Sequence, residues 1–201
     1  MTENAIQQDA QEGIGAFLGL LFSLAAASVL RCWALVARGR SGEGMAQIRQ
    51  GFDTGGPTRA HLRAHSLALL AEAWGKGGNF TEGLAVLAKA LTEVEETGIR
   101  FYEPELRRLK GEFLLALNPE NPAEAEDCFR LAIETARRQQ SRAWELRATM
   151  SLARLWQRQG RRDEAHAALA AVYGTFTEGF TTPDLVDAAA LLNGLAGRDE
   201  G

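Results

Sequence analysis

Two histidines, His61 and His65, are the first residues of this sequence whose type and spacing could support chemistry. They stand four positions apart, so one face of a helix would carry both, and such a pair can coordinate a metal ion. No third ligand is evident nearby, and the segment HLRAH lacks the glutamate that follows the first histidine in zinc-protease helices. We therefore interpret both as solvated or groove-facing histidines and expect neither a metal ion nor a cofactor.

The nucleophilic side chains give no catalytic pattern either. Cys32 and Cys128 lie far apart in apolar segments, which favours reduced thiols in a cytoplasmic protein over a disulfide. No serine or cysteine stands in a nucleophile motif, and no glycine-rich phosphate loop joins a strand to a helix. The sequence thus predicts a protein that is not an enzyme.

Arginines are concentrated between positions 137 and 162, where eight of them accompany a single acid, Glu145. Such a run could form a stripe that binds anions. It could also form solvated helix faces whose arginines pair with acids of neighbouring segments, and this is the interpretation we favour. The net charge of −4 does not suggest nucleic-acid binding.

The stretch Leu67 to Gly98 shows what kind of element carries these residues. Apolar side chains recur at helical spacing on both sides of Gly77-Gly78-Asn79, which predicts two amphipathic helices joined by a tight turn, with Thr81 as N-cap of the second. Small residues, Gly75 and Gly83 among them, fall where the two helices must approach closely. One such hairpin cannot bury its own apolar stripe and therefore requires neighbours of the same kind.

A repeat supplies those neighbours. The small residue of the second helix recurs as Gly44, Gly83, Ala125 and Ala165, at intervals of 39, 42 and 40 residues. The four predicted hairpins span 31–52, 59–98, 103–140 and 145–174. Arrays of this kind become stable at about three or more units. Few prolines and much alanine and leucine agree with an all-α chain.

The two ends of the chain differ from the repeats. Residues 1–12 are polar and predict a disordered tail. Residues 14–30 form an uncharged run of 17 residues, which we interpret as a buried first helix; a membrane anchor is the alternative, although the run is shorter than the about 20 residues of a usual span. At the other end, Thr182 as N-cap and Pro183 in the first turn predict a capping helix within 181–197, with Phe176 and Phe180 packed beneath it. Asn121 is the expected N-cap in the third hairpin.

The repeats resemble tetratricopeptide repeats of the longer, maltose-activator-like variety. Residues 28–192 resemble more closely the C-terminal helical-repeat region of large bacterial signalling proteins, which carry a nucleotide cyclase or DNA-binding domain and then a P-loop ATPase module. The matching phrases are LALLAEAWGKGG, FYEPELRRLKGEFLLAL, AEAEDCFRLAIETARRQQ, LRATMSLARLWQRQGRRDEA and VYGTFTEGFTTPDL. The resemblance implies a right-handed superhelical array of about four antiparallel hairpins over residues 13–180. It also implies a fragment or stand-alone remnant of the sensing and interaction part, because no upstream cyclase, ATPase loop or DNA-binding module is present.

In hairpin arrays of this type, the first helix of each pair lines the concave groove. Counting along each first helix from its close-packing residue, Ala71, Gly111 or Ala153, gives a candidate partner-binding set. Its members are His65, Glu72, Glu105, Arg108, Glu112, Arg147, Met150, Arg154 and Gln157.

These expectations lead to a function hypothesis with an alternative. The hypothesis is a cytoplasmic interaction scaffold in bacterial signal transduction, which binds a peptide or a partner such as a cyclase or ATPase domain in the groove. The alternative is a small-ligand sensor region of a nucleotide cyclase or ATPase-linked regulator, with the ligand held between hairpins.

Overall fold

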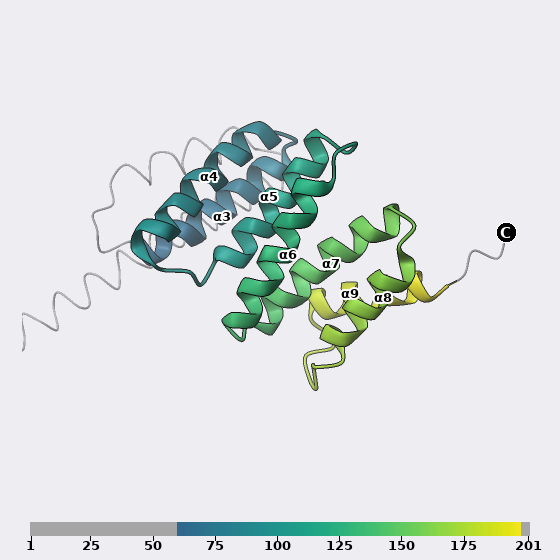
Figure 1. Ribbon diagram of the computed structural model, residues 1–201. Helices are drawn as coiled ribbons and strands as arrows, with labels where there is room; N and C mark the ends of the chain where they lie inside the picture. Colours follow the sequence, from purple (N-terminus) through teal and green to yellow (C-terminus); the bar gives the residue numbers. More distant parts are fainter. Residues whose placement is uncertain (1–59, 198–201) are drawn as a thin grey trace, which may run out of the picture.

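The structure of the protein is a computed structural model, whose described part comprises residues 60–197 (Figure 1). The described part is entirely α-helical apart from its turns. In chain order its helices are α3 (Ala60–Lys76), α4 (Phe80–Thr97), α5 (Glu103–Leu117), α6 (Ala123–Arg138), α7 (Arg142–Arg158), α8 (Arg162–Tyr173) and α9 (Pro183–Ala196).

The helices form hairpins that stack in the order of the chain. The hairpins are α3–α4, α5–α6 and α7–α8, and α9 closes the array beyond α8 (Figure 1). The first helices also pack on one another, α3 on α5, α5 on α7 and α7 on α9, whereas the second helices α4, α6 and α8 do not. This arrangement confirms the predicted α-solenoid. The predicted hairpin 31–52, the tail 1–12 and the run 14–30 lie outside the described residues.

Turn residues with positive φ end several of the helices. Gly78 and Gly160 occupy equivalent places after α3 and α7, with φ of 75° and 78°. Gln140 has a φ of 54° in the turn between α6 and α7, where a glycine would be less strained. The turn at Gly77-Gly78-Asn79 therefore falls where it was predicted, and Gly160 forms the equivalent turn in the hairpin α7–α8.

The predicted helix starts are partly wrong. Asn79, rather than Thr81, is the N-cap of α4, and Pro122, rather than Asn121, is the N-cap of α6. Both helices start close to their first apolar residue, because burial of the apolar stripe outweighs the small contribution of a capping side chain. Thr182 is the N-cap of α9 with Pro183 next to it, as predicted, although its hydroxyl makes no capping hydrogen bond.

A phenylalanine of the following hairpin packs into the hairpin α3–α4. The ring of Phe113 in α5 lies between α3 and α4, where a Cβ atom added to Gly75 or Gly83 would come within 2.5 Å of it. Gly111 in turn receives the ring of Phe129 at the same distance. Gly75 and Gly83, the predicted small residues, thus leave space for an aromatic ring of α5.

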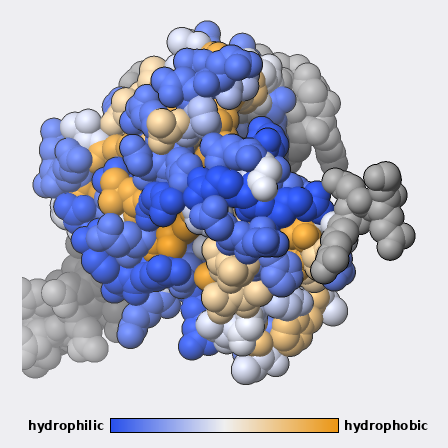
Figure 2. Space-filling view, turned by 45° about the vertical axis from the view of Figure 1, so that its right-hand side comes forward, coloured by the Kyte–Doolittle hydropathy of each residue, from blue (hydrophilic) through white to orange (hydrophobic). Residues whose placement is uncertain are grey.

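Most large apolar side chains enter two core clusters, one from α3 to α5 and a larger one from α5 to α9. The exposed large apolar residues of the described part are Phe101, Leu117, Phe180 and Val186. Phe176 packs on the larger cluster, which includes residues of α9, whereas Phe180 is 47% exposed and its ring is tilted against that of Tyr173 at 5.9 Å. The face in Figure 2 is mainly hydrophilic, with apolar atoms showing between hydrophilic ridges.

We predict that Gly83→Ala destabilises the fold by about 1–3 kcal/mol, because the new methyl group overlaps the buried Phe113 ring. The matched control is Gly194→Ala in α9, where an added Cβ meets nothing within 4 Å. That change should be neutral or stabilise by up to about 1 kcal/mol, since alanine favours helix. Urea unfolding of the three proteins measures both effects. Equal midpoints for the two variants would contradict the packing described for Phe113.

Candidate functional site: the first-helix face

The first helices place a row of polar side chains on one face of the array, which we call the first-helix face. It comprises Glu72 of α3, Glu105, Arg108 and Glu112 of α5, Arg147, Ser151 and Arg154 of α7, and Asp184 of α9. Most of these positions were predicted from helix geometry. The side chain of His65, which belongs to α3, lies outside the described part of the structure.

Arg108 is the centre of this row. Its guanidinium makes a two-pronged ion pair with Glu105, with both N–O distances at 2.8 Å, and lies 3.6 Å from Glu112. Burial alone would lower the pKa of Arg108, but the neighbouring carboxylates of Glu105, Glu112 and Glu72 raise it above its ordinary value. Arg108 is therefore a fixed positive charge surrounded by acids.

Ser151 connects the second and third of these first helices. Its hydroxyl donates a 2.6 Å hydrogen bond to Glu112 and accepts a longer one, 3.4 Å, from Arg108. Ser151 was not predicted, because a serine inside a helix gives no signal of a partner 39 residues away.

Arg147 extends the row toward the end of the array. Its Nε atom donates to Asp184 at 2.7 Å, and Nη1 lies 3.6 Å from Glu105. Its guanidinium also stacks over the ring of Trp144 at 5.3 Å. Asp184 lies in the first turn of α9, and its bond to Arg147 joins α9 to α7.

The remaining predicted residues of α7 differ in their surroundings. Arg154 is exposed and makes no ion pair within the described part of the chain, and Gln157 is partly exposed. Met150 is only 4% exposed and belongs to the same core cluster as Leu185 and Ala188 of α9. Met150 is therefore buried and does not lie on the open face as predicted. Counting positions along one helix cannot show which of its residues become buried with a later helix such as α9.

An aromatic group lies where α5 and α7 begin. Tyr102 makes an edge-on contact with Trp144, with ring centroids 6.0 Å apart, and Phe101 packs edge-on against Tyr102 at 5.0 Å. Partial burial raises the pKa of the Tyr102 hydroxyl. Phe101 is 58% exposed, so this aromatic group offers an apolar contact beside Arg147.

The arginines between 137 and 162 mostly pair with acids or backbone carbonyls of neighbouring elements. Arg137 binds Glu145 at 2.6 Å, and Arg161 binds both Glu164 and Glu126. Arg162 donates to two carbonyl groups at the end of α9. The interpretation as paired helix faces is thus supported over a continuous anion-binding stripe.

Glu126 of α6 lies on the side away from the first-helix face and is bound by three donor side chains. It accepts hydrogen bonds from the indole N–H of Trp156 at 3.0 Å and from Arg130 and Arg161. Burial by itself raises the pKa of Glu126, but these three donors together lower it below its ordinary value. The guanidinium groups of Arg130 and Arg161 also lie over the Trp156 ring, at 5.3 and 4.5 Å.

Among residues 60–197, no group of three or more histidine, cysteine or acidic side chains is arranged to hold a metal ion. Within the same residues no helix is both long and apolar enough to cross a bilayer. Cys128 is a free, partly buried thiol.

We predict that Glu126→Gln lowers the melting temperature by a few degrees at pH 7 and by much less at pH 3. The folded-state pKa of Glu126 lies below the ordinary 4.5, so its carboxylate stabilises the fold above that pH and this contribution is lost as pH falls through the folded value. Calorimetry at both pH values measures the difference. The control is Glu120→Gln in the exposed turn between α5 and α6, which should shift neither value. A Glu126→Gln deficit of equal size at pH 3 would show that the charge is not the cause.

The sequence matches none of the protein families and none of the curated proteins with which it was compared. Solved structures do match. A putative kinesin light chain of Podosopora anserina, built from nearly identical TPR-like repeats, superposes with a TM-score of 0.63 at 17% identity, over 86% of this chain and 85% of that one. A single-substitution variant of that protein gives a TM-score of 0.64 at 16% identity over the same shares. These likenesses, together with the stacked hairpins, show that the chain has a tetratricopeptide-like repeat fold.

Proposed function

We propose that the chain is a non-enzymatic interaction scaffold that binds a peptide segment or partner domain across the first-helix face. The observation that carries this proposal is the row of polar side chains from the first helices α3, α5 and α7 and from the closing helix α9, which includes the exposed Arg154. A row of this kind offers donors and acceptors at regular steps, as an elongated ligand requires. The tetratricopeptide-like fold supports the proposal, because its successive hairpins form an extended surface.

The row discriminates between partners more than it attracts them. Arg108 and Arg147 each already contact two acids, and a ligand that binds them must replace or add to those contacts. Exchanging one ion pair for another gains little free energy but rejects ligands whose charges do not match. Arg154, which has no ion pair among the described residues, offers the first contact for an acidic side chain of the partner.

The apolar contribution comes from the aromatic group next to Arg147. Phe101 and Trp144 can receive an apolar or aromatic side chain of the partner, and such buried anchors supply most of the affinity in protein interfaces. The ligand that fits both features is a segment with an acidic residue for Arg154 and an aromatic residue about 15 Å away along α7, because Trp144 and Arg154 lie ten residues apart on that helix.

We place the scaffold in the cytoplasm, within bacterial signal transduction and beside a nucleotide cyclase or ATPase module, with a protein partner and no nucleic acid. This context rests on the resemblance of the repeats to the helical-repeat regions of such signalling proteins.

We predict that Arg154→Glu weakens partner binding about three- to tenfold, and that Arg147→Glu combined with Arg154→Glu weakens it further. Both changes replace a positive charge of the first-helix face by a negative one. Proteins from an extract of the source cells, retained on the immobilised chain and quantified by mass spectrometry, provide the measurement.

The matched control is Lys89→Glu, which makes the same change of charge at an exposed position of the second helix α4. Its retained proteins should equal those of the unaltered chain. If the double variant retains the same proteins in the same amounts as Lys89→Glu, the first-helix face is not the contact surface.

A further inference from the structure

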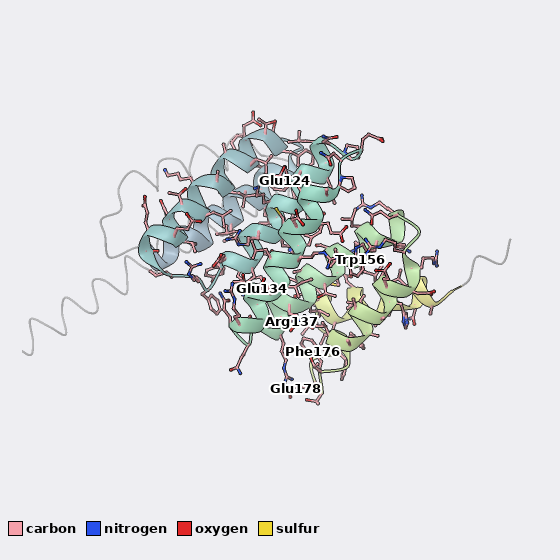
Figure 3. All side chains as sticks on the ribbon, viewed as in Figure 1. Glu124, Glu134, Arg137, Trp156, Phe176 and Glu178 are labelled. Carbon is pink, nitrogen blue, oxygen red and sulfur yellow. The ribbon has the colours of Figure 1, made fainter. Side chains whose placement is uncertain are left out.

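On the side away from the first-helix face, a cavity of about 320 Å³ opens between α6 and α8. The backbones of these helices stay apart because each packs on α7. The floor of the cavity is formed by Thr149, Leu152 and Trp156 of α7, and its walls include Ile133 of α6 and Ala168 of α8. This volume lies at the small end of the range for ligand pockets, about 300–1,000 Å³. Figure 3 shows Trp156 and residues of α6 along the space between the two helices.

The charges at the rim are already compensated. Arg130 binds Glu126 at 2.7 Å, and Arg137 binds Glu145 at 2.6 Å. Glu134, which stands between the two arginines on α6, is exposed to water. No charged group of the lining is therefore both buried and unpaired, and the cavity does not require an ion.

One polar group of the lining does need a partner. The side chain of Thr149 is 2% exposed, and its hydroxyl has no hydrogen-bond partner among the described residues. Thr92 and Thr97 of α4 show the usual solution in a helix, in which the hydroxyl donates to the carbonyl four residues earlier. Thr149 does not make this bond. The other polar group of the floor, the indole N–H of Trp156, already donates to Glu126.

We propose that this cavity binds a small uncharged amphiphile: an aromatic or alicyclic body with one hydroxyl or carbonyl group. The body packs on Leu152, Trp156 and Ile133. Its polar atom hydrogen-bonds to Thr149, whose buried hydroxyl turns toward the cavity when the ligand binds. Apolar walls and a single hydroxyl without a hydrogen-bond partner match an uncharged amphiphile. A charged ligand would have to compete with the ion pairs at the rim. The site is separate from the first-helix face and does not depend on its function.

The test is titration calorimetry of the full chain with 2-naphthol, which is uncharged at neutral pH and carries one hydroxyl, and with 2-naphthoate as its anionic counterpart. We expect 2-naphthol to bind with a dissociation constant below about 1 mM and 2-naphthoate to bind at least about tenfold more weakly. Absence of saturable binding of 2-naphthol, or tighter binding of 2-naphthoate, overturns the proposal.

Two variants locate the site. Ala168→Phe fills the cavity from its wall and should weaken 2-naphthol at least about tenfold, whereas Ala167→Phe, at the neighbouring exposed position of α8, should leave it unchanged. Thr149→Val keeps the shape, removes the hydroxyl and should weaken binding about fivefold. Circular dichroism melts verify folding, and Thr149→Val serves alone if Ala168→Phe does not fold. Unchanged affinity in a folded Ala168→Phe or Thr149→Val variant overturns the proposal.

Discussion

The ring of Phe113 has to fit between α3 and α4, and two positions in those helices can bear no side chain as a result. Gly75 and Gly83 leave the space, and the ring of the next repeat fills it, so neighbouring hairpins interlock instead of merely touching. Gly111 leaves space in the same way for Phe129 of α6, so the two helices of the hairpin α5–α6 also pack closely. Because each hairpin completes the core of its neighbour, the helices must follow one another in a row, and the molecule gains two long faces of different character.

The two faces differ because first helices pack on one another and second helices do not. Contact between first helices brings polar side chains from separate repeats within hydrogen-bonding distance, as Ser151 with Glu112 and Arg147 with Asp184 show. Between the second helices α6 and α8, the backbones stay apart and leave a cavity over α7. One packing rule therefore yields a surface with ion pairs from α5 to α9 on one side and a partly open cavity on the other.

The sequence predicts the local features of this fold well and its long-range pairings poorly. Helical spacing and the glycine turns predict the hairpins because both depend on residues a few positions apart. The N-caps were missed at α4 and α6, since apolar burial and not the capping side chain decides where those helices begin. Six polar candidates, from Glu72 to Arg154, belong to the first-helix face. Met150 does not, because it is buried in a core cluster that includes residues of α9, two helices further along the chain. Nothing in the neighbouring sequence indicates the hydrogen-bond partners of Ser151 or the unpaired hydroxyl of Thr149.

Helix α7 carries both faces at once. Arg147 and Ser151 point to the first-helix face, whereas Thr149, Leu152 and Trp156, about half a turn away around the same helix, form the floor of the cavity. A solenoid transmits force mainly between neighbours, so a molecule held between α6 and α8 can affect the first-helix face only through α7. Any change in the distance between those helices would act on the contacts of Ser151 with α5 and of Arg147 with α9. Coupling between the two sites, if measured, should therefore be lost when those two contacts are removed and should persist when α3 and α4 are altered.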